Sequence, residues 1–136
     1  MTPARVSPDR FAAALAARLH AVVPSGISVR AEGSAVSVYD PLLAGGSASA
    51  ELLMEEDGRS VVELVELAAY GILDAIQDVV MESTKEQWPD PSGARNAPGA
   101  EARVVGQQLQ MWFGDEAAPA IRLAPIDLSE LVNGAA

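Results

Sequence analysis

The sequence contains no cysteine among its 136 residues. This absence excludes disulfide bonds, zinc sites built from thiolates and catalytic thiols. A chain without disulfides suits a reducing compartment, so we predict a cytoplasmic location. All of its stability must come from non-covalent packing.

Basic residues are also scarce. The chain has one lysine (Lys85), one histidine (His20) and eight arginines, and its formal charge is −10. Nucleic-acid binding normally depends on clustered Lys and Arg, so we predict no nucleic-acid partner. A catalytic triad normally needs a histidine beside the nucleophile. His20 stands near the end of an expected helix, where the helix dipole favours it, and we therefore predict no catalytic residue.

Long apolar runs and nucleotide-binding motifs are missing as well. Arg18 and His20 interrupt the N-terminal apolar segment before a signal-peptide core can form. No other stretch reaches the roughly 18 apolar residues of a membrane span. The pair Gly45-Gly46 lacks both the Lys-Ser/Thr of a P-loop and the spacing of a dinucleotide-binding turn. We therefore expect no membrane association, no signal peptide and no cofactor.

Aromatic residues make up only 4% of the chain, whereas apolar residues make up 49%. Ala, Val, Leu and Ile must therefore fill the core, and a chain of this length can bury one core without cross-links. We predict a single domain, residues 1–136, with flexible ends at about residues 1–6 and 132–136.

The N-terminal segment predicts a helix. Ser7 is a favourable N-cap, Pro8 suits the first helical position, and Asp9 suits the positive end of the helix dipole. Pro24 and Gly26 should end the helix. Apolar residues then recur at helical spacing on one face: Phe11, Leu15, Leu19 and Val22.

Residues 27–39 predict a β-hairpin, because apolar and polar residues alternate on both sides of Glu32-Gly33, where we place the turn. The segment Pro41 to Ala50 begins as a loop. A third strand is predicted around Ser49 to Glu55.

One long helix is predicted from residue 61 to about Gln87. Ser60 and Glu63 fit a capping box, in which each side chain binds the backbone N–H of the other residue. Pro89 disfavours helical geometry at Trp88 and should end the helix. A helix of this length spans about 40 Å, so we expect it at the centre of the domain. Its expected apolar face consists of Val61, Leu64, Val65, Ala68, Ile72, Leu73, Ile76, Val79 and Val80.

The last third of the chain predicts a loop and two strands. Residues 89–99 contain three prolines and two glycines and predict the loop. Residues 102–113 predict one strand, in which Val105, Leu109, Met111 and Phe113 share one side. The segment "AIRLAPI" predicts another strand after the turn "GDEAAP". One turn capped by Asp127 should follow and then fray. The order α-β-β-(β)-α-β-β predicts an α+β fold, with an antiparallel sheet of four to five strands and two helices packed on one face.

Acidic residues are concentrated on the long helix and the segment before it. Ten of them lie between Glu51 and Glu86, against two basic residues in that range. Asp74, Asp78 and Glu82 are i,i+4 neighbours. The Mg²⁺ sites of all-helical nucleotide pyrophosphohydrolases draw carboxylates from two facing helices, whereas one helix supplies them here. We predict no metal site and treat these residues as a solvated face and candidate interaction surface.

The two tryptophans are the other candidates for interaction. Trp88 ends the long helix and is predicted to fold back on the core as a cap. Met111 and Phe113 should share the inner side of a strand, so Trp112 should point to its outer face or an edge. If either ring is exposed it becomes a docking anchor, because tryptophan is enriched among residues that dominate interfaces.

The segments "IQDVVMESTKEQWPDP" and "LQMWFGDEAAPAIRLAPI" resemble small uncharacterised proteins of high-GC actinobacteria. In those proteins a helix ending in Gln-Asp…Trp-Pro precedes a hairpin with Trp-aromatic-Gly-Asp at its turn. The resemblance covers about the second half of the chain and implies no activity and no functional residues. The element order is also similar to that of small, acidic, dimeric bacterial secretion chaperones, which hold partner segments against a sheet face.

Two functions are compatible with these patterns. The first is a non-enzymatic protein-interaction module: an adaptor, a chaperone-like homodimer or an assembly subunit. The alternative is a small-molecule-binding protein or carboxylate-dependent enzyme, with a pocket between the long helix and the sheet. Tyr70, Asp74 and the loop of residues 89–99 would line that pocket.

Overall fold

The computed structural model describes residues 6–39, 46–50, 60–85, 88–89 and 99–132. Two helices pack with two antiparallel sheets, which confirms the predicted α+β class and, approximately, the element order. The described strands form two sheets of three and four strands rather than one. The first sheet has the order β1 (Ser28–Glu32), β2 (Ala35–Tyr39), β3 (Ser47–Ser49).

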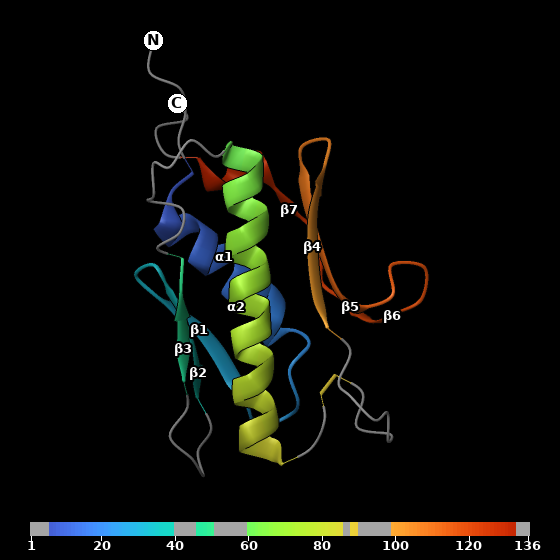
Figure 1. The fold of residues 1–136 in the computed structure, drawn as a ribbon. Helices are drawn as coiled ribbons and strands as arrows, with labels where there is room; N and C mark the ends of the chain where they lie inside the picture. The colour runs from blue at the N-terminus through green and yellow to red at the C-terminus, as the bar shows by residue number, and fades with distance from the viewer. Residues whose placement is uncertain (1–5, 40–45, 51–59, 86–87, 90–98, 133–136) are drawn as a thin grey trace.

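The second sheet has the order β4-β5-β6, and β7 pairs with β5 beside this path. Its strands are β4 (Ala100–Val105), β5 (Gln108–Gly114), β6 (Pro119–Arg122) and β7 (Ile126–Asp127), followed by the 3-10 helix η2 (Leu128–Leu131). Helix α2 (Val61–Thr84) stands between β3 and β4, and helix α1 (Pro8–His20) lies behind it against β1 and β2 (Figure 1). The long helix is therefore central, as predicted.

The start of α1 follows the sequence signals. The Ser7 hydroxyl oxygen accepts the N–H of Arg10 at 3.2 Å, and Pro8 occupies the first turn. The helix ends at His20, four residues before Pro24. His20 Nδ1 accepts the N–H of Val29 at 3.1 Å, so the single histidine ties the end of α1 to the first sheet.

The first hairpin turns one residue later than predicted. Glu32 still belongs to β1 and pairs with Ala35, so the turn consists of Gly33-Ser34. Gly33 has a φ of 60°, which a residue with a side chain rarely adopts. The third strand, β3, lies before the predicted position; residues 51–55 of that prediction are outside the described residues.

A glycine allows β3 to approach α2 closely. A Cβ placed on Gly46 would lie 2.8 Å from Cγ2 of Val79, well inside van der Waals contact. Val79 is β-branched and has few alternative rotamers in a helix. Gly46 therefore has a packing role, which agrees with the absence of a phosphate-binding motif there.

Helix α2 begins at the predicted cap and ends earlier than predicted. The Ser60 hydroxyl oxygen accepts the N–H of Glu63 at 3.1 Å, and the hydroxyl lies 3.3 Å from Glu63 Oε1. The glutamate thus contacts the hydroxyl, whereas the capping box predicts a bond to the backbone N–H. The helix ends at Thr84 because Lys85 adopts a left-handed conformation (φ 58°) and closes the last turn onto the Met81 carbonyl.

Replacing Ser60 by alanine is expected to lower the free energy of unfolding by about 1 kcal/mol, because the N–H of Glu63 loses its acceptor. Urea unfolding followed by circular dichroism measures the change. The control is Ser83→Ala inside the last turn of α2, where alanine is the better helix former and no loss is expected. Equal losses in both variants would show that the cap is unimportant.

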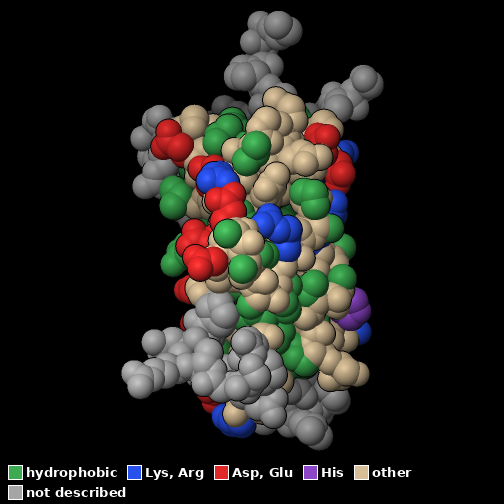
Figure 2. Space-filling view, turned by 90° about the vertical axis from the view of Figure 1, so that its right-hand side faces the viewer, with side chains coloured by type: hydrophobic (Ala, Val, Ile, Leu, Met, Phe, Trp, Pro, Cys, Tyr) green, Lys and Arg blue, Asp and Glu red, His purple; other side chains and the backbone are tan. Residues whose placement is uncertain are grey.

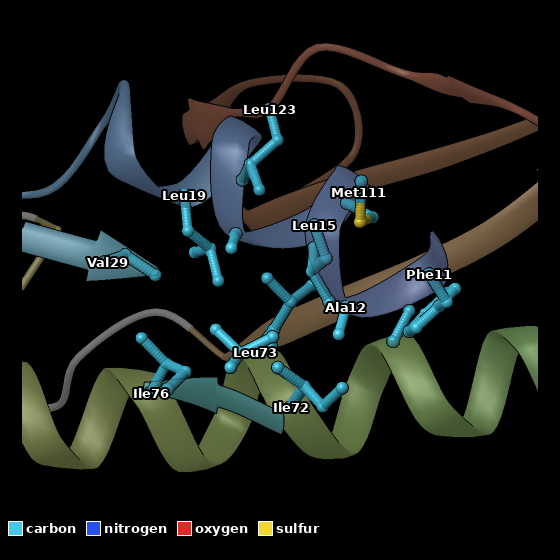
Figure 3. Packing of buried hydrophobic residues seen from close by; sticks show 14 of the residues in the cluster. Phe11, Ala12, Leu15, Leu19, Val29, Ile72, Leu73, Ile76, Met111 and Leu123 are labelled. Atoms are coloured by element: carbon cyan, nitrogen blue, oxygen red, sulfur yellow. The ribbon is translucent and has the colours of Figure 1, made fainter. Parts of the chain in front are cut away.

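The core lies between the two helices and the sheets. In Figure 3, apolar side chains of α1 lie between those of α2 and those of the second sheet. The labelled residues are Phe11, Ala12, Leu15 and Leu19 of α1, Ile72, Leu73 and Ile76 of α2, Val29, Met111 and Leu123. Most of the predicted apolar face of α2 is buried, but Val61 in its first turn is 46% exposed, which corrects that assignment.

The predicted strand of residues 102–113 is a hairpin of two strands. The chain reverses at Gly106-Gln107, where Gly106 has a φ of 62°. Leu109, Met111 and Phe113 are buried as predicted. Val105 was assigned to the same side, but it precedes the reversal and is exposed.

The C-terminal segment is docked rather than frayed as far as Val132. Leu131 is fully buried, and its carbonyl accepts the N–H of Ser7 at 2.7 Å. Val6 and Val132 form an isolated β-bridge. The other residues predicted to be flexible, 1–5 and 133–136, lie outside the described residues.

Candidate functional site

The outer side of α2 carries charge of one sign. Every charged residue between Val61 and Thr84 is acidic: Glu63, Glu66, Asp74, Asp78 and Glu82. Asp74 and Asp78 are exposed, as predicted. Glu82 is exposed and accepts a hydrogen bond from Lys85 Nζ at 2.8 Å. This bond lowers the pKa of the Glu82 carboxyl.

Two large side chains interrupt this acidic face. Leu67 is 41% exposed and Tyr70 is 48% exposed, and the i,i+3 spacing places them side by side. Beside them Gly71 is exposed, with open space where a side chain would stand. We call Glu63, Leu67, Tyr70, Gly71, Asp74 and Asp78 the α2 surface. Leu67 was not among the predicted interaction residues, although an apolar residue among acidic positions is a visible signal.

Glu66 has a structural role instead. It is partly buried, and its Oε2 accepts the N–H of Val104 in β4 at 2.8 Å. Because β4 is the edge strand of its sheet, this N–H has no partner strand to pair with. The carboxylate thus closes part of the edge and fixes α2 to the second sheet.

Trp88 is a core residue. Its ring is 4% exposed and meets the ring of Phe113 edge to face, with centroids 5.1 Å apart. Its backbone carbonyl accepts a hydrogen bond from Gln77 Nε2 at 3.0 Å. The predicted cap on the core is confirmed, and the alternative of an exposed anchor is wrong for this residue.

Trp112 lies on the other side of β5. Met111 and Phe113 belong to the core cluster, and Trp112 does not, as the strand alternation predicts. The ring is nevertheless only 4% exposed, so it is not an open anchor. The Arg103 and Arg122 guanidinium carbons stand 5.8 and 5.3 Å from its centroid. Two arginines thus cover a ring that was predicted to face outwards.

The candidate residues therefore fall into three separate places. Asp74, Asp78 and Glu82 follow one another along α2, Trp88 is inside the core, and Trp112 is on the outer face of the second sheet. Within the described ranges, no three His, Cys, Asp or Glu side chains are grouped so that they could hold a metal ion. Neither described helix is long and apolar enough to cross a membrane.

No protein-family model, curated protein or solved structure matches the chain. The resemblance to small actinobacterial proteins therefore stays a prediction. The residues themselves must carry the functional argument.

Proposed function

We propose that this protein is a non-enzymatic interaction module that binds a positively charged segment of a partner protein through the α2 surface. The observation that carries the proposal is the pair Leu67 and Tyr70, half-exposed at the centre of a helix face whose charged residues are all acidic. Interfaces of this kind combine an apolar or aromatic centre with a charged rim.

Charge supports a cationic partner. The protein has a formal charge of −10, and the charged members of the α2 surface, Glu63, Asp74 and Asp78, are all exposed. Like charges on one helix repel weakly, and a cationic segment would relieve that repulsion. Complementary potentials also accelerate association. A homodimer joined through two α2 surfaces would instead bring like charges together.

The alternative, a pocket between α2 and the sheet, is supported less well. Tyr70 and Asp74, which were expected to line it, are exposed on the outer side of α2. The inner side of α2 is filled by core residues such as Ile72 and Ile76. The loop that would complete the pocket, residues 90–98, lies outside the described residues.

Tyr70→Ala is expected to weaken binding of a cationic amphipathic peptide of Lys and Leu by about tenfold, because tyrosine side chains supply much of the energy at such centres. Isothermal titration calorimetry measures the affinity. The variant keeps every charge of the protein. A loss of affinity would therefore come from the missing tyrosine contact and not from weaker attraction between opposite charges.

Tyr39→Ala is the matched control, since Tyr39 is 41% exposed but lies on β2. Tyr70→Ala should unfold within about 0.5 kcal/mol of the natural protein, as surface substitutions usually do. Tyr39→Ala should cost about 1 kcal/mol, because it also loses contacts with Glu32 and Arg30. If the two variants bind the peptide equally well, the α2 surface is not the binding site.

A further inference from the structure

The indole N–H of Trp112 is buried without a hydrogen-bond acceptor. Trp112 Nε1 is the one buried side-chain nitrogen or oxygen of the described residues that has no partner. Buried polar groups are nearly always paired, and an orphaned donor costs free energy. The ring lies on the outer face of the second sheet, outside the core cluster, so this donor lies beneath the outer surface of that sheet and not in the core.

A loop residue holds both arginines around this ring. The Glu116 carboxylate forms an ion pair with Arg103, and the Glu116 backbone carbonyl accepts a hydrogen bond from Arg122 Nη2 at 3.0 Å. Glu116 lies between β5 and β6, and this loop projects away from the helices in Figure 1. We call Arg103, Trp112, Glu116 and Arg122 the Trp112 cluster. Figure 2, which views the molecule from this side, shows basic and acidic side chains next to each other.

We propose that the Trp112 cluster binds an acidic peptide segment of a partner, whose carboxylate replaces that of Glu116. Arginine is always charged and suits carboxylates. Glu116 of the chain itself makes these contacts now. Its carboxylate pairs with Arg103, and its backbone carbonyl accepts a hydrogen bond from Arg122. It leaves the Trp112 N–H unsatisfied, so an occupant that supplies one more acceptor would bind with an additional hydrogen bond.

The exchange is feasible because the existing contact is exposed. The side chains of Arg103 and Glu116 are about half-exposed, at 51% and 48%, and exposed ion pairs contribute little to stability. Nε1 itself has no accessible surface, so an acceptor reaches it only when side chains around the ring move, and an incoming peptide reaches the arginines only by displacing the Glu116 contacts. Glu116 therefore acts as an intramolecular competitor, with an effective concentration on the order of millimolar or higher.

A peptide is favoured over inorganic phosphate. Phosphate would bring close to two negative charges to a protein that already carries −10, whereas a single carboxylate brings one. This site is independent of the α2 surface, which selects the opposite charge.

The two indole N–H signals in a ¹H–¹⁵N spectrum test the proposal, because the chain has only two tryptophans. The probe is the acetylated and amidated peptide Gly-Asp-Glu-Ala-Ala-Pro, a copy of residues 114–119. The matched neutral peptide has Asn and Gln at the acidic positions. The Glu116→Gln variant removes the competing carboxylate, and Trp88→Phe assigns the signals. A dispersed spectrum shows that each variant is folded, and in the variants that keep Trp88 an unchanged Trp88 signal shows it as well.

In Glu116→Gln, the acidic peptide is expected to shift the Trp112 signal saturably, with an affinity at least about tenfold higher than in the natural protein. Adding Arg122→Gln to that variant should abolish the shift. The proposal is overturned if the Trp112 signal does not move up to about 10 mM acidic peptide, if the neutral peptide moves it equally, or if Arg122→Gln has no effect. A shift with inorganic phosphate but not with the peptide would identify a general anion site and would also overturn it.

Discussion

Trp88→Ala is expected to lower the free energy of unfolding by about 3–5 kcal/mol, the range for deletion of a buried large aromatic side chain. The ring is 96% buried and packs edge to face on Phe113. Its removal leaves a cavity at the end of α2 and exposes part of the core. Since a small domain is stable by only about 5–15 kcal/mol, the variant should lose a large part of the natural stability.

Urea unfolding followed by far-ultraviolet circular dichroism measures this loss, because the signal does not depend on the deleted indole. Trp88→Phe keeps an aromatic contact and should cost clearly less. Tyr70→Ala, a large aromatic deletion at an exposed position, should change stability by no more than about 0.5 kcal/mol. A loss below about 1 kcal/mol in Trp88→Ala would mean that Trp88 is not a core residue.

This result also determines which tryptophan can be used in binding experiments. A failure of Trp88→Ala to bind a partner does not identify a contact, because the same change destabilises the fold. Tyr70 is exposed, so its variant reports on a surface.

Leu131→Ala is expected to cost about 2–5 kcal/mol, as deletions of buried leucines do. Leu131 is fully buried in η2, and its carbonyl accepts the N–H of Ser7. The lost side chain would leave a cavity beside the start of α1. A chain that simply frayed after Asp127 would lose nothing.

The same urea series measures this change. Glu130→Ala is the neighbouring control: Glu130 is exposed, and its contact with Arg18 is a 3.5 Å ion pair at the surface, so a loss of at most about 1 kcal/mol is expected. If Leu131→Ala matches this control, the docking of η2 does not contribute to stability.

Local signals in the sequence predicted the helices well. Ser7 and Ser60 are N-caps, and each accepts a hydrogen bond from the residue three positions later. Both partners therefore lie within one short segment of sequence. The apolar spacing on α1 likewise requires only the helical period. The class of the fold followed from the order of such elements.

Features that depend on distant segments could not be predicted in this way. The turn at Gly106-Gln107 lacks the Asn-Gly or Asp-Gly pair that marks a tight hairpin, so two strands were taken for one. The docking of Leu131 depends on α1, at the other end of the described chain. Its sequence context, short and followed by Gly and Ala, indicates only a frayed tail.

In the candidate sites, too, local features were predicted and features that depend on distant segments were not. Strand alternation correctly placed Trp112 on the outer side of β5, but its burial depends on Arg103 and Arg122 from two other strands. The acidic face of α2 was predicted from spacing within one helix. The contact of Glu66 with the second sheet depends on the unpaired edge of β4, which the sequence does not reveal.

The bond between the Ser7 N–H and the Leu131 carbonyl also affects how the protein folds while it is being made. Ribosomes add about 5–20 residues per second, starting at the amino end. Helix α1 is therefore complete many seconds before its first turn can meet Leu131. During that interval part of its apolar side lacks its final cover, and a chaperone or a neighbouring nascent chain can bind it. Packing of the first turn of α1 against Leu131 thus waits for the arrival of η2, and slow elongation in the second half of the message would prolong the vulnerable period.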